Sequence, residues 1–277
     1  MGYGTGIGWC LCFRCGRPIG PGASFNAWLG CQKVSPACAN CYAEIDVTQK
    51  YGPEFWGPEA TSSRKMMSES TWRNPDAWNR RCRREGTRMI VFCNSESDVF
   101  ELHRDVTAAR RRLFDVIERT ERLIWLLLTK RPENIMHMVP GSWRIRFPEN
   151  VWIGTSIESQ YYADKRMPYL VEVPATLRCV SNEPALGPVD FTPWLDQLGW
   201  IKSGGESVSL KDVHRARPTE LDWLRDVRDQ CAAGGVPWFC KELGTLWARA
   251  NGVAGKADKL HEWPADLQIQ QFPMVAP

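Results

Sequence analysis

Three cysteines in one short segment have the spacing of a reactive metal site. Cys31, Cys38 and Cys41 form the pattern C-x6-C-x2-C, after a short apolar run and before a predicted helix. A structural zinc site takes four protein ligands, whereas a catalytic metal centre keeps one coordination position open for substrate. Three thiolates on one loop are therefore what an iron–sulfur cluster with one iron free of protein ligands needs, although most clusters are held by four cysteines.

A second set of cysteines offers a competing interpretation. Cys12 and Cys15 form a C-x2-C pair, and with Cys38 and Cys41 they make two such pairs, which is close to zinc-ribbon spacing. That set would bind a structural zinc, and it does not use Cys31. Chance grouping among the eleven cysteines is the third interpretation. Five further cysteines in apolar segments are expected to be small buried hydrophobes: Cys82, Cys93, Cys179, Cys231 and Cys240.

Length and composition limit the class of protein. The chain has 277 residues, 43% of them hydrophobic, which is enough for one large core, and α/β barrels of this length are usually one domain. We find no apolar run of about 18 residues and no signal-peptide pattern at the N-terminus, so we expect a soluble cytoplasmic protein without membrane contact. Its cysteines are then thiols and metal ligands rather than disulfides.

Positive charge is concentrated more locally than the net charge of +3 indicates. Residues 73–88 hold six arginines, and residues 110–112 add three more on a later predicted helix. Arginine side chains of this kind could hold phosphates, and an ordinary solvated helix face is the alternative. Some of the fourteen tryptophans could stack on bases, while most are expected in the core.

Short apolar strands alternate with amphipathic helices along the chain. This alternation predicts βα units and a parallel sheet, that is, an α/β fold. We expect strands at residues 25–29, 89–93, 123–128, 151–154, 176–180, 200–203 and 236–239, and helices at 39–50, 106–119, 132–138, 160–171 and 218–233. Gly234 and Gly235 should stop the last helix. The barrel would comprise residues 1–243, and residues 244–277 would be a C-terminal extension.

Polar and chargeable residues follow almost every predicted strand. These residues lie at 94–98, 129–131, 155–158, 181–184, 204–207 and 241–242. In a parallel α/β barrel the carboxyl ends of the strands lie on one face, and that face builds the active site. The cysteine loop follows the first predicted strand, so we expect it on the same face. A zinc ribbon predicts no such ring of carboxylates and lysines.

In these segments the chain resembles the radical S-adenosylmethionine superfamily, and more closely a phage and bacterial group with a three-cysteine motif. The matching segments are residues 6–10, 25–31, 33–44, 94–95 with 97–100, 127–133, 154–156 with 158, 183–184 with 186–190, and 204–207. The resemblance implies a partial (βα)6-type, TIM-like barrel. Two features depart from it: the usual spacing is C-x3-C-x2-C, and residues 11–24, with Cys12 and Cys15, look like an inserted loop that could hold an additional zinc or a second cluster. The role of Cys10 stays open.

The resemblance also implies a cofactor and a reaction. Cys31, Cys38 and Cys41 would ligate three irons of a [4Fe–4S] cluster, and the fourth iron would take the amino and carboxylate groups of S-adenosylmethionine. An electron from an external reducing donor, passed through the cluster, would cleave the sulfonium to methionine and a 5′-deoxyadenosyl radical, which abstracts a substrate hydrogen. The cofactor supplies this chemistry, and the protein positions and shields it.

Residues of the matching segments are assigned to parts of the cofactor by their chemistry. Ser95 and Asp98 can accept hydrogen bonds from the ammonium of the methionine end, and Tyr42 can pack against adenine. Short polar side chains suit the ribose hydroxyls, namely Thr155, Ser156 and Glu158. Gly204 and Gly205 would let backbone approach a ligand closely. The charged residues that remain for the substrate or for a catalytic proton are Lys130, Arg131, Glu183, Glu206 and Lys241.

The expected substrate is a nucleobase or a nucleotide-linked group. The resembling group is frequent in phages, which chemically alter their DNA, so hypermodification of phage DNA in the host cytosol would fit, for example the rearrangement of an amino-acid-decorated thymine by an isomerase. Two alternatives stay open: a radical enzyme acting on a peptide or small metabolite, and a non-enzymatic zinc-ribbon protein that binds nucleic acid. The reaction type, the fate of S-adenosylmethionine and the oligomeric state are not determined.

Overall fold

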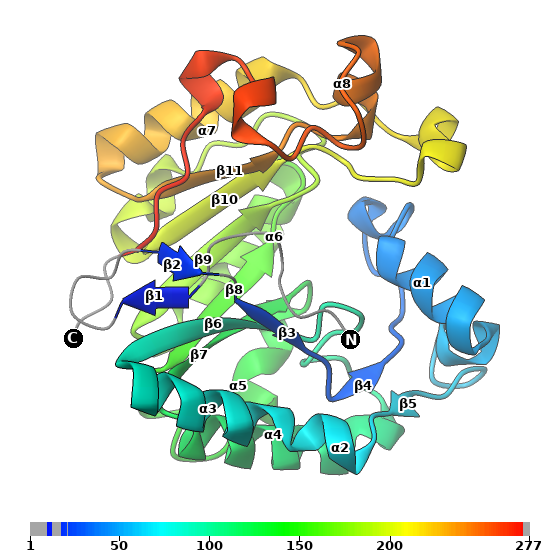
Figure 1. Ribbon diagram of the computed structural model, residues 1–277, viewed down its shortest axis with the longest axis vertical. Helices are drawn as coiled ribbons and strands as arrows, with labels where there is room; N and C mark the ends of the chain where they lie inside the picture. Colours follow the sequence, from blue (N-terminus) through cyan, green and yellow to red (C-terminus); the bar gives the residue numbers. More distant parts are fainter. Residues whose placement is uncertain (1–9, 13–17, 21, 274–277) are drawn as a thin grey trace.

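Seven parallel strands form a curled sheet that makes half of a barrel (Figure 1). The structure is a computed structural model, and it describes residues 10–12, 18–20 and 22–273. In spatial order the parallel strands are β3 (Ala23–Phe25), β6 (Thr87–Cys93), β7 (Leu123–Thr129), β8 (Val151–Ser156), β9 (Leu177–Asn182), β10 (Trp200–Gly204) and β11 (Trp238–Glu242). The predicted α/β class and parallel sheet are confirmed.

Two short strands from the predicted insertion extend the sheet beside β6. β1 (Cys10–Cys12) pairs antiparallel with the first part of β6, and β3 pairs with the last part of the same strand edge. β2 (Pro18–Gly20) pairs antiparallel with β1. Cys15 and the side chains of Cys10 and Cys12 lie outside the described part of the structure, so a zinc site at these cysteines stays a prediction.

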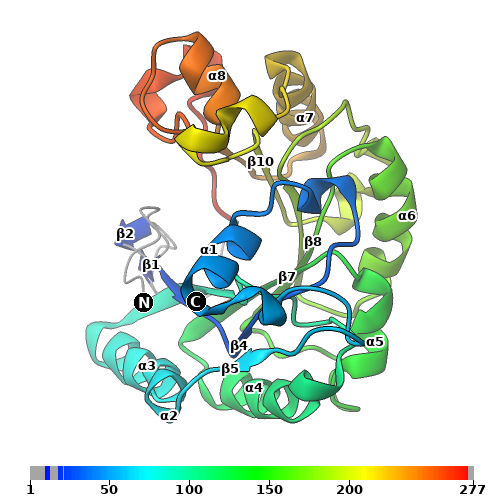
Figure 2. The same cartoon turned by 90° about the vertical axis from the view of Figure 1, so that its right-hand side faces the viewer.

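Helices cover the convex face of the half-barrel (Figure 2). The larger ones are α3 (Asn74–Glu85), α4 (Thr107–Arg119), α6 (Gln160–Val171) and α7 (Leu221–Gly234), and the shorter ones are α2 (Glu69–Trp72), α5 (Ile135–Met138) and α8 (Thr245–Ala250). In α7 the spacing of Leu224, Val227 and Cys231 buries one face, and Gly235 ends the helix in the left-handed conformation at φ 68°, as predicted.

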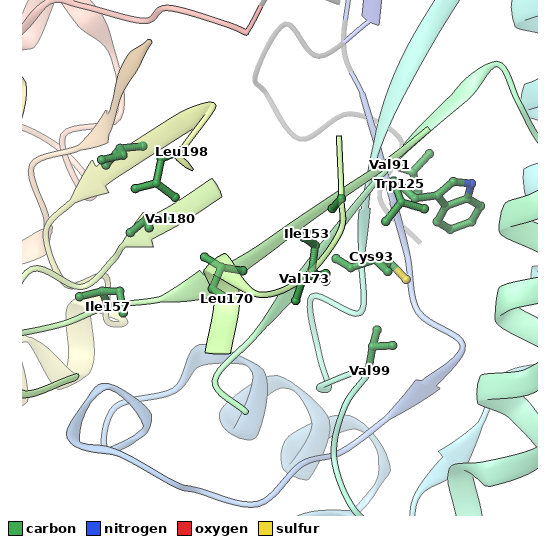
Figure 3. Packing of buried hydrophobic residues seen from close by; sticks show 14 of the residues in the cluster. Val91, Cys93, Val99, Trp125, Ile153, Ile157, Leu170, Val173, Val180 and Leu198 are labelled. Atoms are coloured by element: carbon green, nitrogen blue, oxygen red, sulfur yellow. The ribbon is translucent and has the colours of Figure 1, made fainter. Parts of the chain in front are cut away.

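The main core lies between the convex face and these helices. Val91, Trp125 and Ile153 come from three neighbouring strands and pack together, with Leu170 of α6 near by (Figure 3). The five cysteines predicted to be buried are buried free thiols. Most of the tryptophans are core residues, as expected: Trp28, Trp72, Trp78, Trp125, Trp143, Trp152, Trp200, Trp238 and Trp263 are buried.

The concave face changes from apolar to polar along the strands. Successive side chains of a strand point to opposite faces, so every second residue lies on the same face. Ile124, Trp152 and Phe239 belong to one buried apolar cluster near the amino ends of their strands. Further along β8 and β11, positions of the same face hold Ser156 and Lys241. The polar residues therefore gather at the carboxyl ends.

Several predicted elements have different bounds in the structure; the predicted helix 218–233, for example, is α7, and two differences lie next to the cysteine loop. The predicted strand 25–29 is divided into β3 and β4 (Trp28–Leu29), and β4 pairs with β5 (Lys65–Met66) in a separate small sheet. The division falls at Asn26, whose side-chain Oδ1 accepts a hydrogen bond from Glu96 N and so replaces a strand partner. The predicted helix 39–50 begins later, as α1 (Tyr42–Tyr51) with Cys41 at its N-cap.

Short 3-10 helices and a returning C-terminal segment complete the fold. The 3-10 helices are η1 (Pro36–Cys38), η2 (Pro53–Phe55), η3 (Arg104–Val106), η4 (Pro132–Asn134), η5 (Thr192–Gln197), η6 (Leu210–Arg215), η7 (Leu260–Glu262) and η8 (Ala265–Leu267). Cys240 N donates to Ile269 O at 2.9 Å, which ties the C-terminal segment to β11. Within the described residues, no helix combines the length and apolar character needed to cross a membrane.

Candidate active site

A cavity of about 210 Å³ lies at the carboxyl ends of the parallel strands. Phe92, Leu128 and Ser156 contribute to its lining from β6, β7 and β8. The cysteine loop and the start of α1 also line it, and Figures 1 and 2 together place α1 in front of these strand ends. Residues from almost the whole chain therefore meet at one place.

Most of the residues predicted from the sequence line this cavity. They are Cys31, Cys38, Cys41, Tyr42, Ser95, Asp98, Lys130, Arg131, Ser156, Glu183, Glu206 and Lys241. Sequence reasoning placed Asn94 among the polar strand-end residues but gave it no role; it lies at the left-handed φ of 57° directly after β6 and lines the cavity. Its side-chain Nδ2 is buried with no hydrogen-bond partner among the described residues. Its position directly after a buried strand was the sequence signal that could have indicated a residue of the site.

Cys31 is held by the backbone on both sides of it. Gly30 has φ 102°, and a side chain there would meet Phe55 O at 2.0 Å, so only glycine fits. Cys31 O accepts a hydrogen bond from Gly57 N at 3.0 Å, and Arg131 Nη1 lies 3.7 Å from Cys31 Sγ. Burial raises the pKa of the Cys31 thiol to about 12, although the Arg131 guanidinium acts in the opposite direction. The thiol is therefore protonated at neutral pH unless a metal displaces the proton.

The other two cysteines of the loop are placed by η1 and by the start of α1. Cys38 N donates to Ser35 O at 2.9 Å, and Cys38 Sγ lies 3.9 Å from Ser35 Oγ. Cys41 is the N-cap residue of α1. Burial raises the pKa of the Cys41 thiol. The backbone N–H groups of Glu44 and Ala43 and the Lys130 ammonium act in the opposite direction, but the net pKa is raised. All three thiols of the loop are free.

The described part of the structure does not place the three thiols as ligands of a single metal ion. Within the described part of the chain, no group of three or more His, Cys, Asp or Glu side chains is arranged to hold one metal ion. The thiols instead face a common cavity from different positions on the loop. This arrangement does not match a mononuclear metal site.

Asp98 has no acceptor capacity left for a ligand. Its Oδ1 accepts from Thr129 Oγ1 at 2.7 Å and Phe100 N at 2.9 Å, and its Oδ2 accepts from Lys130 N at 3.1 Å and Arg131 Nη1 at 2.9 Å. Burial alone would raise its pKa, but Arg131 and these hydrogen bonds hold the pKa below its usual value. A carboxylate offers about four acceptor positions. Asp98 therefore joins the ends of β6 and β7, and the predicted contact with a ligand ammonium does not fit this geometry.

Glu206 is likewise engaged within the protein. Its Oε2 accepts from Asn40 Nδ2 at 3.0 Å and from Arg217 Nε at 3.1 Å, and Arg217 Nη1 donates to Pro36 O at 2.8 Å. Although burial raises the pKa of Glu206, the hydrogen bonds from Arg217 lower it, with a net decrease. Glu206 and Arg217 thus connect the end of β10 to the cysteine loop. This pairing explains the position of the loop better than it explains a role for Glu206 in proton transfer.

Glu183 and Lys241 form a charged pair on another wall of the cavity. Lys241 Nζ lies 3.0 Å from Glu183 Oε2 and 3.2 Å from Glu242 Oε1. Burial would lower the pKa of Lys241, but the two carboxylates raise it, and for Glu183 burial is outweighed by Lys241, which lowers the pKa. Both groups are therefore charged at neutral pH. Glu183 Oε1 is buried and has no hydrogen-bond partner among the described residues, so it can accept from a ligand.

Four predicted cofactor contacts are absent from the described lining of the cavity. Thr155 Oγ1 donates to Thr129 O at 2.9 Å, and Glu158 Oε2 pairs with Arg166 Nη1 at 2.7 Å in a buried position. A side chain at Gly204 or Gly205 would meet Glu242 O at 3.0 Å or Leu243 O at 2.2 Å. These glycines permit close approach of neighbouring chain segments rather than of a ligand. Of the predicted ribose contacts, the lining retains Ser156.

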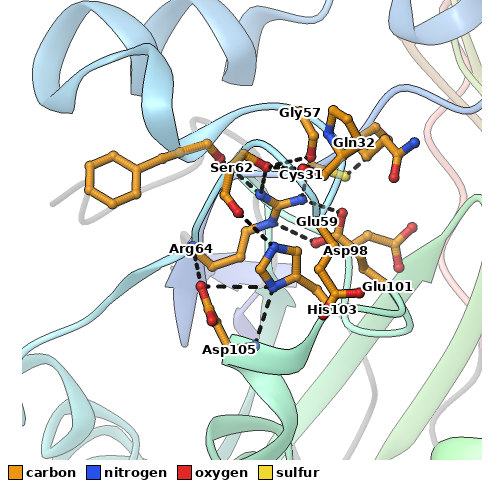
Figure 4. Close-up of polar contacts among 12 residues, drawn as sticks. Cys31, Gln32, Gly57, Glu59, Ser62, Arg64, Asp98, Glu101, His103 and Asp105 are labelled. Atoms are coloured by element: carbon orange, nitrogen blue, oxygen red, sulfur yellow. Dashed lines mark hydrogen bonds and ion pairs between the residues drawn. The ribbon is translucent and has the colours of Figure 1, made fainter.

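A buried ionic network lies behind Cys31 (Figure 4). Arg64 donates to both oxygens of Glu101, at 2.8 and 2.7 Å, and the two side chains are at most 1% exposed. Arg64 Nη2 also donates to Gly57 O at 2.9 Å, and Gly57 in turn binds the backbone of Cys31. The network therefore positions the segment that holds Cys31.

Several of the arginines that could have held phosphates pair with acidic residues. Arg83 Nη2 lies 3.1 Å from Glu121 Oε1, and Arg81 Nε lies 3.4 Å from Glu85 Oε2. Arg112 forms two hydrogen bonds with Glu69. α3 and α4 lie on the convex side, away from the cavity (Figure 2). For these arginines the structure favours the alternative, a solvated helix face, whose exposed side chains form ion pairs.

The fold and the site define an α/β half-barrel protein whose strand-end cavity is closed over by a loop with three free cysteines. A family model described as "Protein of unknown function (DUF5131)" matches residues 21–269, so the chain belongs to the DUF5131 family. The match contains the whole lining of the cavity and begins after Cys12 and Cys15. No curated protein and no solved structure shows significant similarity to the chain.

Proposed function

We propose that this protein is a radical S-adenosylmethionine enzyme that holds a [4Fe–4S] cluster on Cys31, Cys38 and Cys41. The observation that carries the proposal is that three free thiols of one loop line the same strand-end cavity as Glu183, directly after β9, and Lys241 of β11. The family match adds support, because it includes these three cysteines and excludes Cys12 and Cys15.

The donor set of the cavity fits such a cluster. In a cluster each thiolate binds a different iron, so its cysteines surround a volume and need not meet at one point. Three thiols of one loop that line the same cavity agree with this requirement. Three cysteines leave one iron without a protein ligand. The remaining cavity, with its charged and hydroxyl side chains, would then receive S-adenosylmethionine.

The (βα)6 barrel type is part of the same proposal. The cysteine loop follows β3, the first parallel strand, and β6 to β10 supply five more. β11 then adds a seventh strand at the far edge. Because β3 and β6 to β10 make six parallel strands, we assign the half-barrel to the partial (βα)6 type.

The residues of the cavity would bind and orient the cofactor. When bound, the cluster would supply the electron for reductive cleavage of S-adenosylmethionine, and with it the radical chemistry of this enzyme class. Tyr42 Oη donates to Ser95 O at 3.1 Å, which fixes the half-exposed ring as a wall for the adenine. Ser156 would contact the ribose. In place of Asp98, the free acceptor Glu183 Oε1 would accept a hydrogen bond from the ammonium at the methionine end of S-adenosylmethionine.

Glu183→Gln is expected to weaken the binding of S-adenosylmethionine about 10- to 100-fold. A hydrogen bond to a charged group contributes about 1.5–3 kcal/mol, and glutamine keeps the shape of the side chain without its charge. Isothermal titration calorimetry on the anaerobically reconstituted protein measures the change. Glu149→Gln on the exposed surface is the control and should bind as the wild type does. Unchanged affinity in Glu183→Gln would place the ammonium elsewhere.

Metal and product analysis tests the proposed function. After anaerobic purification we expect about four irons and four sulfides per chain. Reduction in the presence of S-adenosylmethionine should then release 5′-deoxyadenosine. About one zinc per chain without iron would overturn the proposal in favour of a zinc ribbon. The substrate stays a prediction, and comparing 5′-deoxyadenosine release with DNA, nucleotides, peptides and amino acids distinguishes its classes.

A further inference from the structure

Arg131 contacts the sulfur of one cysteine of the loop directly. Its Nη1 lies 3.7 Å from Cys31 Sγ and donates to Asp98 Oδ2 at 2.9 Å, while its Nη2 donates to Gln32 O at 2.8 Å. The Arg131 side chain is 8% exposed. The guanidinium thus reaches both the thiol and the backbone of the next residue, and solvent has little access to the contact.

The carboxylates around Arg131 fix its orientation. Asp98 is itself held by donors from three other residues, as described above. Glu101 Oε1 lies 3.7 Å from Arg131 Nη2 and is anchored by Arg64. The guanidinium cannot turn away from Cys31 without removing the charged partner of the buried Asp98 carboxylate at 2.9 Å, which is costly. Its position beside the sulfur is therefore built into the network.

The three cysteines consequently have unequal surroundings. Cys31 lies against a guanidinium, Cys38 lies near the hydroxyl of Ser35, and Cys41 is at the N-terminus of α1. A full positive charge at one ligand acts on the cluster more strongly than a hydroxyl does. Hydrogen bonds to the sulfurs of an iron–sulfur cluster are one of the factors that set its reduction potential.

We propose that Arg131 is a positioning residue that raises the reduction potential of the cluster through its N–H contact with the Cys31 sulfur. This inference rests on the proposed function. Reduction adds one electron from an external one-electron donor, such as dithionite, and forms or breaks no bond. The reduced cluster carries one more negative charge, so a nearby guanidinium stabilises it more than the oxidised form. The same contact aligns the Cys31 thiolate.

The test is a redox titration of the reconstituted protein followed by electron paramagnetic resonance. Arg131→Gln should lower the ratio of reduced to oxidised cluster about tenfold at a fixed potential, which corresponds to about 59 mV for a one-electron couple. Arg131→Lys keeps the charge and should restore most of the shift. Arg119→Gln is the control, because it removes a guanidinium paired with a carboxylate on the convex side of the sheet, away from the cavity, and should leave the potential unchanged.

Asp98→Asn provides a second test with the opposite sign. Asparagine keeps the acceptor for Thr129 and Phe100 but removes the negative charge opposite Arg131. The potential should therefore rise in this variant, whereas general loosening of the site would shift both variants in the same direction. The Asp98 variant also decides the question if Arg131→Gln does not fold.

The outcomes separate this inference from the proposed function. A wild-type protein that takes up no iron–sulfur cluster overturns both. A wild-type protein with about four irons per chain, together with equal potentials in wild type, Arg131→Gln and Asp98→Asn, overturns only the role of Arg131. Opposite shifts in the two variants, with Arg131→Lys close to the wild type, support it.

Discussion

Replacing Cys31 with alanine is expected to abolish iron binding. Cys31 is one of three thiols that line the cavity, and three is the smallest set proposed to hold the cluster. Substitutions outside the metal ligands already cost about 10- to 100-fold in metal affinity, so the loss of a ligand should exceed this range. Iron and sulfide analysis after anaerobic reconstitution, with the visible absorption of the cluster, measures the effect.

The matched control for this variant is the double substitution Cys12→Ala/Cys15→Ala. Both cysteines belong to the competing zinc set and lie outside the region of the family match. The double variant should keep its iron and its release of 5′-deoxyadenosine. The reverse pattern, with zinc lost in the double variant and unchanged in Cys31→Ala, would favour the zinc ribbon. Cys31 is decisive because the zinc set does not use it.

Replacing Arg64 with methionine is expected to lower the free energy of unfolding by about 3–5 kcal/mol. The substitution leaves Glu101 charged and buried without its main partner, and breaking a buried ion pair from one side has this cost. Arg64 also donates to Ser63 O at 2.7 Å and Gly57 O at 2.9 Å, so backbone acceptors lose their partners as well. Since natural domains are stable by about 5–15 kcal/mol, a large part of the stability is at stake.

Urea denaturation of the protein without a cluster measures this effect independently of the proposed chemistry. Arg146→Met is the control, because Arg146 and Glu149 form an exposed pair with side chains 74% and 69% accessible. Exposed pairs contribute about 0–1 kcal/mol, so the control should unfold close to the wild type. Equal midpoints for Arg64→Met and the wild type would show that the network behind Cys31 does not stabilise the fold.

Much of the sheet was predictable because its signals are local. The apolar runs of β6 and β7 are continuous, and strands buried on both faces have this composition. The interruption of the predicted strand 25–29 was not predictable, because it depends on Asn26 bonding to Glu96, 70 positions away. Helix α3 was also missed, since its many arginines were considered as phosphate ligands, whereas its buried face is formed by Trp78, Asn79 and Cys82.

The candidate site was also predictable only in part, where local sequence signals were sufficient. The strand-end rule brought Lys130, Glu183 and Lys241 to one cavity, because parallel strands share one carboxyl-terminal edge. The rule could not tell which of these polar groups are free. Asp98 looks like a ligand contact in the sequence, but its partner Thr129 lies 31 positions away. Glu183 has a free oxygen because its own partner, Lys241, occupies only one side of the carboxylate.

The sequence by itself determined the set of three cysteines, the parallel α/β architecture and the face on which polar residues gather. These features follow from spacing and from short apolar runs that alternate with amphipathic segments, which are properties of neighbouring residues. Only the tertiary structure decided which side chains of that face are already satisfied, and it placed Arg131 against Cys31, 100 positions away in the chain. Hydrogen bonds and ion pairs between distant segments depend on how the strands and loops are packed, so residue types and spacing do not specify them.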